Sequence, residues 1–288
     1  MSIQLRKAER SQAKLRIGVS APSGGGKTYS ALLMASGMTD WNKIAVIDTE
    51  NGRGDIYSDL GDYNIITLEA PFSPERYIEA IKSCEEAGME VIIIDSISHE
   101  WEGQGGCLEI NEALANAKYR GNTWSAWNET TPRHRKFIEA IISSTAHVIT
   151  TVRNKVDTIM TEDKKVKKVG IKEITREGFE YEITVNFNID RDTHKALPSK
   201  DNTRLFEGKD PFIITAETGK ALIDWMKSGK KVKPVKKEIV ITKQDVVDYL
   251  TGLEVPKKEM AAYILEKTEL DAKTADPKEV LAALKKAK

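Results

Sequence analysis

The chain has 288 residues, of which 40% are hydrophobic and 31% are charged. This length allows one large domain, or one domain and a small appendage, with enough apolar residues to fill a core. Lysine plus arginine and aspartate plus glutamate both number 44, so no overall charge attracts nucleic acid or a membrane, and such a contact must come from a local patch.

Cysteine and histidine usage excludes further classes of protein. Cys84 and Cys107 are the two cysteines and form no CxxC pair, which predicts a reducing compartment and no disulfide between them. The four histidines are scattered without the spacing of zinc ligands. The sequence contains no secretory signal and no apolar run of about 18 residues, which predicts a cytoplasmic protein that makes no membrane contact.

A strand, a glycine-rich turn and a helix are predicted over residues 15–35. The apolar run begins at Leu15, the turn carries three consecutive glycines, and helix-forming residues follow. A phosphate-binding loop requires this order, because glycines let backbone N–H groups surround a polyphosphate at a helix N-terminus. The motif is G-x-x-x-x-G-K-[ST], and its first position here is Ala21. The alternative is a glycine-rich turn without a ligand.

This loop predicts the residues that hold ATP and Mg²⁺. The Lys27 ammonium is expected to reach the β- and γ-phosphates, and the Thr28 hydroxyl is expected to coordinate Mg²⁺. The expected nucleotide-binding residues are Ser23, Gly24, Gly25, Gly26, Lys27, Thr28 and Tyr29.

Two later runs, residues 43–48 and 91–94, have the continuous apolar character of strands buried on both faces of a parallel sheet. The second run ends in Asp95, at the sheet edge where α/β proteins bind ligands, so Asp95 is the other expected Mg²⁺ ligand. The alternative is an aspartate that caps the next turn. Between these runs we expect a short strand over 65–68 and a helix that begins at Ser73 and Pro74.

The expected catalytic base is Glu50. The residue after Asp95 is Ser96, so no carboxylate is available directly behind the Mg²⁺ ligand. Glu50 follows the strand over 43–48, and from there its carboxylate could orient and deprotonate a water molecule for attack on the γ-phosphate. The alternative is an ordinary acid at a strand end.

Residues 96–128 form a long connection that contains three of the five tryptophans. It is predicted to be helical over 108–114, and a helix that returns to the sheet is predicted from Thr131. Arg133 and Arg135 lie at the start of that helix, and aromatic rings beside cations suit the stacking of single-stranded bases. The alternative is that the tryptophans pack this connection onto the core.

A further buried strand over 147–152 is followed by Arg153, which is expected to sense the γ-phosphate and to transmit its state to the next loop. That loop, over 156–176, mixes lysines with acidic residues. Its candidate DNA-binding residues are Lys164, Lys165, Lys167 and Lys168. The alternative is a charged loop that is only solvated.

The remainder of the core is expected to be largely β. Residues 179–189 alternate in hydropathy, which predicts a half-exposed strand, and shorter strands are expected over 203–206 and 212–215. A polar turn over 199–204 can project cations from the domain, and a helix over 218–226 closes the core.

Composition divides the chain into three parts. Residues 1–228 are expected to form the core, with a polar and basic arm over 1–14 that is either disordered or docked on a neighbouring subunit. Residues 229–240 are rich in lysine and contain a proline, which indicates a linker. Residues 241–288 predict a small module of amphipathic helices that begins with a capping box.

Five segments together resemble one protein family. The segments are Ala21–Thr28, Ile47–Glu50, Ile94–Ser96, Thr131–His134 and Ser199–Asp201. They resemble bacteriophage and prophage RecA-like ATPases, the ATP-binding proteins associated with phage single-strand annealing and recombination. The resemblance covers residues 10–226. It implies an α/β RecA-like P-loop core, with a mainly parallel central sheet flanked by helices, in the cytoplasm of a bacterial host.

The resemblance also implies an activity and partners. It implies ATP hydrolysis with Mg²⁺ at the subunit interfaces of a homo-oligomer, either a filament or a ring. It implies single-stranded DNA binding through two loops that follow core strands, and a phage annealing or single-strand-binding protein as a partner. By position, Lys27 and Thr28 match the phosphate-loop residues of the family, Asp95 matches its Mg²⁺ ligand and Glu50 its water-activating glutamate.

Two further matches depart from the family pattern. Thr151 stands where RecA has a γ-phosphate-sensing glutamine, which leaves Arg153 as the substitute. Lys200 matches a cation that reaches a neighbouring subunit's γ-phosphate in related hexameric ATPases, where the pattern is Lys-x-Arg. Here Lys200 is followed by Asp-Asn, so the second cation is missing or is Arg204.

The leading hypothesis is therefore an oligomeric ATPase whose nucleotide state controls its hold on single-stranded DNA. A P-loop small-molecule kinase and an ATP-gated adaptor that loads another phage protein remain as alternatives.

Overall fold

The computed structural model describes residues 5, 7–160, 166–230, 243–252, 255–256, 258–271 and 275–286. The chain divides into two compact units, Met1–Val232 and Lys233–Lys288. No helix of the described residues is both long enough and apolar enough to cross a bilayer.

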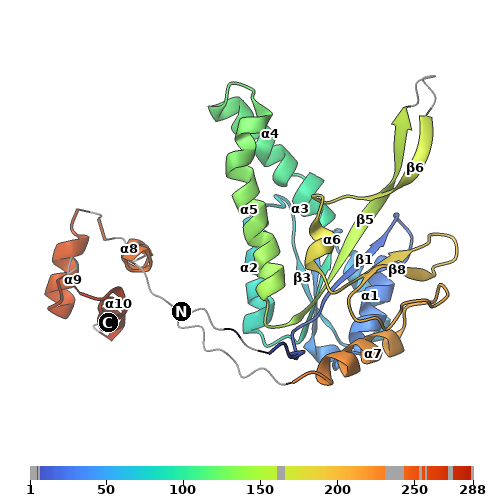
Figure 1. Ribbon diagram of the computed structural model, residues 1–288. Helices are drawn as coiled ribbons and strands as arrows, with labels where there is room; N and C mark the ends of the chain where they lie inside the picture. Colours follow the sequence, from blue (N-terminus) through green and yellow to red (C-terminus); the bar gives the residue numbers. More distant parts are fainter. Residues whose placement is uncertain are drawn as a thin grey trace. The chain divides into compact units, whose positions relative to one another are not determined.

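The first unit is built on one sheet whose strands run in the order β3-β2-β4-β5-β1-β7-β8 (Figure 1). The strands are β1 (Arg16–Ala21), β2 (Ile44–Asp48), β3 (Asn64–Thr67), β4 (Val91–Asp95), β5 (His147–Met160), β6 (Val166–Glu173), β7 (Val185–Ile189) and β8 (Ala196–Asp201). All neighbours in this order pair in parallel except β8, which is antiparallel to β7. β6 lies outside this order and pairs with β5, antiparallel to it.

Helices cover both faces of the sheet (Figure 1). In chain order they are α1 (Lys27–Ser36), η1 (Trp41–Lys43), η2 (Arg53–Leu60), α2 (Pro74–Glu86), α3 (Ser98–Glu102), α4 (Cys107–Lys118), α5 (Thr123–Ser143), α6 (Phe179–Glu182) and α7 (Ala216–Lys227). α1 and α7 pack on one face, where Leu32 and Leu222 are fully buried, and α2 and α5 pack on the other with Tyr77 and Phe137. The predicted fold class, a mainly parallel α/β core with flanking helices, is confirmed.

In the residues of the second unit that the structure describes there are three short helices, α8 (Lys243–Gly252), α9 (Met260–Thr268) and α10 (Pro277–Lys286). Their apolar faces bury Leu250, Ile264 and Leu284 against one another. Amphipathic spacing of these apolar residues is what predicted helices here.

The largest departure from the sequence prediction is the segment after Arg153, which was expected to be a loop. β5 continues to Met160, and β6 returns antiparallel to it from Val166 to Glu173. The resulting β5–β6 hairpin projects beyond the rest of the sheet (Figure 1). Its β-branched residues favour extended backbone. Its many charged residues are typical of a solvated loop, and a loop was therefore predicted here.

Other predicted boundaries were wrong for local reasons. Residues 179–189 do not form one strand, because α6 occupies Phe179–Glu182 and the strand begins at Val185. The strand expected over 203–206 is a turn, in which the Asp201 carboxylate accepts hydrogen bonds from the backbone N–H groups of residues 203, 204 and 206. Ser199 and Lys200 lie in β8 rather than in that turn.

Two more segments differ from prediction. The strand expected over 212–215 is reduced to an isolated bridge between Phe212 and Ala196. α5 begins at Thr123, eight residues before the predicted start, because the Asn122 side chain caps it by accepting a hydrogen bond from the Ser125 N–H at 3.2 Å. The helix then runs through Pro132.

Candidate active site

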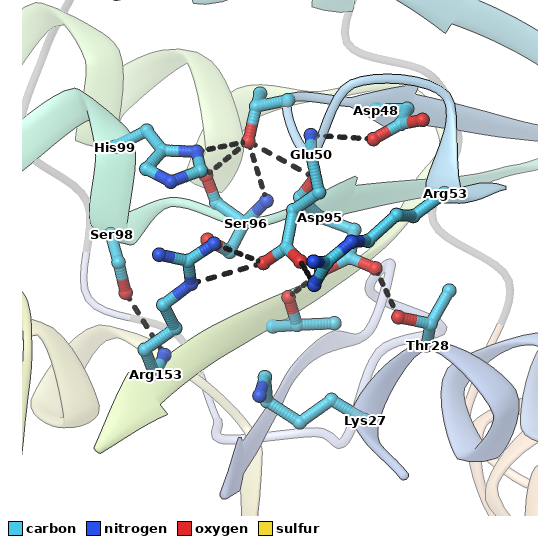
Figure 2. A network of polar contacts seen from close by, with 12 residues as sticks. Lys27, Thr28, Asp48, Glu50, Arg53, Asp95, Ser96, Ser98, His99 and Arg153 are labelled. Atoms are coloured by element: carbon cyan, nitrogen blue, oxygen red, sulfur yellow. Dashed lines mark hydrogen bonds and ion pairs between the residues drawn. The ribbon is translucent and has the colours of Figure 1, made fainter. Parts of the chain in front are cut away.

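The carboxyl ends of four parallel strands bring the predicted site residues together (Figure 2). Strand pairing places Asp48 beside Asp95 at the ends of β2 and β4, and Ala21 beside Arg153 on β1 and β5. The glycine-rich loop follows β1, and Glu50 follows β2. β5 lies between β1 and β4, so Arg153 lies between the loop and the buried Asp95.

The glycine-rich loop has the backbone of an anion site. Gly24 and Gly26 have φ values of +78° and +82°, which side chains with a Cβ rarely adopt. Gly26 precedes α1, and no side chain caps that helix, so its first N–H groups are free to bind an anion. The Lys27 ammonium folds back on the loop and donates to the carbonyl oxygens of Ala21, at 3.2 Å, and Pro22, at 3.1 Å.

Lys27 lies in a mixed electrostatic environment. Burial lowers the pKa of its ammonium, while the nearby carboxylates of Asp95 and Glu50 act to raise it. An anion bound against the loop would add negative charge next to this buried cation and favour its charged form.

Asp95 is buried, with 4% of its surface exposed, and both of its carboxylate oxygens accept hydroxyl hydrogen bonds. Thr28 donates to Oδ2 at 2.5 Å and Thr151 donates to Oδ1 at 2.5 Å. Burial raises the pKa of Asp95, and the two hydroxyl donors oppose that rise. The Asp95 carboxylate and the Thr28 hydroxyl together offer two oxygen ligands. Mg²⁺ prefers oxygen ligands and usually keeps several water molecules, so a site with two protein ligands fits it.

The Glu50 carboxylate is held by two arginines in Figure 2. Its Oε1 accepts from Arg153 Nη2 at 2.8 Å and Nε at 3.0 Å, and its Oε2 accepts from Arg53 Nη1 at 3.3 Å. Burial acts to raise the pKa of Glu50, but hydrogen bonds and charge from Arg153, together with the charge of Lys27, bring it below its ordinary value. Glu50 is therefore ionised at neutral pH, as a general base must be.

Backbone contacts fix the segment that carries Glu50. The Asp48 carboxylate accepts from the Glu50 N–H at 2.6 Å and from the Gly54 N–H at 3.0 Å. Arg153 is fixed in turn, because its N–H donates to the Ser98 hydroxyl at 2.9 Å and its carbonyl accepts from the Ile174 N–H at 2.7 Å. Arg153 thus joins the site to the base of the β5–β6 hairpin.

Sequence reasoning missed a second polar cluster behind Glu50. The Thr49 hydroxyl accepts from the Ser96 N–H at 2.9 Å and lies 2.8 Å from His99 Nδ1. The same hydroxyl donates to the backbone carbonyl oxygen of Asp95, at the end of β4, at 3.1 Å. This cluster ties the end of β2 to the end of β4, and no sequence motif marks it, because its members are 50 residues apart.

A pocket of about 140 Å³ opens between the loop and η2. Its lining contains Ser23, Gly24, Gly26, Lys27, Thr28, Glu50, Arg53, Ile56, Tyr57 and Arg153. Of the residues expected to bind nucleotide, Gly25 packs behind the loop, where a Cβ would lie 2.7 Å from that of Ala21. Tyr29 is 43% exposed, with its ring edge against Tyr57.

The structure does not bring Lys200 to this site. Its ammonium donates to the carbonyl oxygens of Glu180, at 2.9 Å, and Tyr181, at 2.7 Å, which attaches β8 to α6. Arg204, the other candidate for a cation acting on a neighbouring subunit, is exposed.

The candidate DNA-binding residues that the structure describes lie on two elements, α5 and β6. Arg133 forms an ion pair with Glu75 on α2, with Nε 2.7 Å from the carboxylate, while Arg135 is exposed. Lys164 and Lys165 lie outside the described residues. Lys167 and Lys168 belong to β6, but their side chains also lie outside the described part.

The tryptophans of the connection divide between two roles. Trp101 and Trp127 stack on each other with ring centroids 5.6 Å apart, so they pack α3 against α5. Trp124, in the first turn of α5, is 86% exposed and is available for contact with another molecule.

Comparison with known proteins identifies the family. Residues 13–212 match the model of an AAA domain, which is more than half of the chain. No protein of curated function matches the sequence. One similar solved structure comes from a "structural and biochemical analysis of a prototypical ATPase from the type III secretion system of pathogenic bacteria". It is 13% identical, the match covers 95% of this chain and 79% of that one, and the TM-score is 0.36. By the family match, the chain belongs to the AAA domain family of P-loop ATPases.

Proposed function

We propose that this protein hydrolyses ATP at the carboxyl edge of its sheet and that nucleotide state is coupled to single-stranded DNA binding, in phage recombination or annealing. The observation that carries the first half is the convergence of Lys27, Thr28, Asp95 and Glu50 on one strand edge. These groups come from three different strand ends, so their meeting is a property of the fold rather than of one motif.

Each residue has a defined role in this reaction. The loop N–H groups and Lys27 would hold the β- and γ-phosphates, and Thr28 and Asp95 would hold Mg²⁺. The metal would neutralise charge that develops on the phosphate oxygens. The Glu50 carboxylate would orient and deprotonate the attacking water.

Arg153 supports a coupling between the nucleotide and the hairpin. It pairs with Glu50 in the present structure, and a γ-phosphate would compete for the same guanidinium, which would release the Glu50 carboxylate for catalysis. The backbone of Arg153 is continuous with the β5–β6 hairpin. A movement of Arg153 toward phosphate would therefore reach the segment with the candidate DNA-binding lysines.

A homo-oligomer would complete the site with a cation from a neighbouring subunit. Lys200 is engaged with α6 carbonyl groups, so Arg204, which is exposed, is the better placed of the two candidates.

ATP hydrolysis with and without single-stranded DNA tests the proposal. Wild-type protein is expected to hydrolyse ATP faster when DNA is added, and Lys27→Ala should abolish turnover, because the phosphates lose their cation. Lys43→Ala, which removes a lysine outside the pocket, is the control and should behave as wild type. ATP binding without turnover would favour the adaptor, and phosphorylation of an added acceptor would favour the kinase.

A salt titration of DNA binding tests the hairpin separately. Replacing Lys164, Lys165, Lys167 and Lys168 by glutamine should weaken binding and flatten the dependence of the logarithm of affinity on the logarithm of salt concentration. The control replaces Lys82, Lys209, Lys220 and Lys278, all exposed, in the same way. An equal slope in both quadruple variants would remove the hairpin from DNA binding and leave the ATPase proposal intact.

A further inference from the structure

A cluster of three potential metal ligands is buried away from the phosphate loop. Glu100 on α3, Cys107 at the start of α4 and His134 on α5 are 0%, 0% and 5% exposed. Glu100 Oε1 lies 3.1 Å from Cys107 Sγ and 3.0 Å from His134 Nδ1. All three ligand atoms lie within 4.8 Å of one another.

The local backbone is built to bring these side chains together. The chain turns sharply between α3 and α4, where the Gly106 N–H donates to the Gly103 carbonyl at 2.8 Å. A Cβ at Gly106 would lie 2.7 Å from the carbonyl oxygens of Glu100 and His99, so only glycine fits there. This turn places Cys107 beside Glu100 although six residues separate them. His134 is held over the pair by Trp101, whose ring centroid lies 5.5 Å from that of His134.

We propose that Glu100, Cys107 and His134 bind one Zn²⁺ ion. A thiolate, an imidazole nitrogen and a carboxylate oxygen are the donor types that zinc selects. Ligand atoms about 2.0–2.3 Å from one zinc ion lie roughly 3.3–3.8 Å from each other in a tetrahedron. Glu100 Oε1 lies 3.1 Å from Cys107 Sγ and 3.0 Å from His134 Nδ1, so these atoms would move apart by a few tenths of an ångström on binding the ion.

Charge balance supports a divalent cation. Glu100 is a carboxylate with no exposed surface, and its described partners are the Cys107 thiol, which donates to it, and the His134 imidazole. A zinc ion bound by one carboxylate, one thiolate and one neutral imidazole forms a site with no net charge. Binding would release to solvent the thiol proton of Cys107 and any proton on His134.

One of the three ligands borders a pocket. His134 lines a pocket of about 380 Å³ that is also lined by Thr131, Arg135 and Arg176. Glu100 and Cys107 do not line this pocket, so we infer that the ion would enter beside His134 and that a water molecule would complete its four ligands.

The position of the cluster gives the ion a structural role. α3 begins three residues after Asp95, and Ser98 on α3 accepts the hydrogen bond from the Arg153 backbone. An ion that joins α3, α4 and α5 would therefore stabilise the position of α3, which follows Asp95 and holds the Arg153 backbone through Ser98. It touches neither Lys27 nor Glu50, so it takes no part in the chemistry.

Metal analysis of the full-length, tag-free chain tests the assignment. After purification in buffers without chelator, mass spectrometry is expected to find one equivalent of zinc. Replacement by Co²⁺ should give a thiolate-to-cobalt charge-transfer band and the intense visible bands of four-coordinate cobalt. Both signals should be lost in Cys107→Ala. They should persist in Cys84→Ala, which removes the other buried cysteine from α2.

Two further measurements keep the test independent of folding defects in a variant. A chelator should lower the thermal midpoint of the wild type, added zinc should restore it, and Cys107→Ala should respond to neither. Glu100→Gln and His134→Asn should each reduce the zinc content. Wild-type protein that carries no zinc and gives no cobalt–thiolate band at micromolar cobalt would overturn the proposal and leave a hydrogen-bonded triad. Cobalt bands that are lost in Cys84→Ala instead would also overturn it.

Discussion

At the scale of single residues, the site is defined by how each buried charge is satisfied. The Asp95 carboxylate receives one hydroxyl from α1 and one from β5, so its orientation is fixed before any metal arrives. The family pattern suggested that Thr151 stands in place of a phosphate sensor. In the structure Thr151 instead contacts Asp95, and Arg153 is the residue of β5 that faces Glu50.

Thr151→Val should therefore weaken the response to Mg²⁺. The substitution keeps the shape of the side chain but removes one of two donors to Asp95, which leaves the carboxylate less well oriented. We expect the Mg²⁺ concentration that gives half-maximal ATP turnover to rise roughly 10-fold or more, as for other groups that orient a metal ligand. Thr151→Ser should remain close to wild type. An unchanged Mg²⁺ titration of Thr151→Val would show that this hydroxyl does not serve the metal.

His147 predicts a pH dependence of stability. Its Nδ1 accepts a hydrogen bond from the Leu15 N–H at 3.0 Å, and burial, assisted by the charges of Lys14 and Arg16, lowers the pKa of His147 from 6.5 to about 3. Between about pH 3 and pH 6.5 the His147 imidazole is protonated in the unfolded chain and neutral in the folded chain. The stability from the neutral imidazole is complete above pH 6.5 and is lost as the pH falls toward 3.

Urea unfolding at pH 7 and pH 5 measures this effect. Because the pKa shift of His147 is large, the free energy of unfolding of the wild type should fall by about 2 kcal/mol between pH 7 and pH 5 through this group alone. His147→Asn keeps a hydrogen-bond acceptor without a titrating group and should lose less. His194→Asn, which changes an exposed histidine, should follow the wild type. Equal losses in all three proteins would refute the prediction.

At the scale of elements, β5 has two functions that the sequence did not separate. Its first half is a buried core strand, and the hydrophobic run over 147–152 predicted this correctly. Its second half pairs with β6 as a projecting hairpin. This half is rich in charged residues and so resembles a solvated loop. Its pairing with β6, whose partners run from Met160 with Val166 to Asn154 with Glu173, leaves no mark on the local composition.

The α1–α7 contact gives a prediction at the same scale. Gly219 on α7 approaches α1 so closely that a Cβ there would lie 1.9 Å from the Met34 carbonyl oxygen. Gly219→Ala must move one helix and should destabilise the first unit by about 1–3 kcal/mol, the usual cost of overpacking. Lys220→Ala, at an exposed neighbour, should change stability little.

Tryptophan fluorescence during urea unfolding can follow this change, since all five tryptophans precede residue 233 and report on the first unit alone. Equal urea midpoints for Gly219→Ala and Lys220→Ala would show that α1 and α7 can move apart without loss of stability.

At the scale of the whole molecule, strand order decides how much of the site the sequence could reveal. Parallel strands all end at one edge, so apolar runs followed by Lys27, Asp95, Glu50 and Arg153 were enough to predict that these residues meet. The contact of Lys200 with α6 depends on β8, and a polar turn over 199–204 was predicted where the end of this strand lies. The Glu100–Cys107–His134 cluster depends on how three helices pack, and no fixed spacing encodes that arrangement.

The most direct test of the central claim is a paired measurement of ATP binding and ATP turnover in Glu50→Gln. Glutamine keeps the size of the side chain but cannot accept a proton from water. We expect Glu50→Gln to bind Mg²⁺·ATP as the wild type does and to hydrolyse it at least ~10²-fold more slowly, while Glu86→Gln, on the exposed side of α2, should hydrolyse it normally. Wild-type turnover by Glu50→Gln would contradict the account.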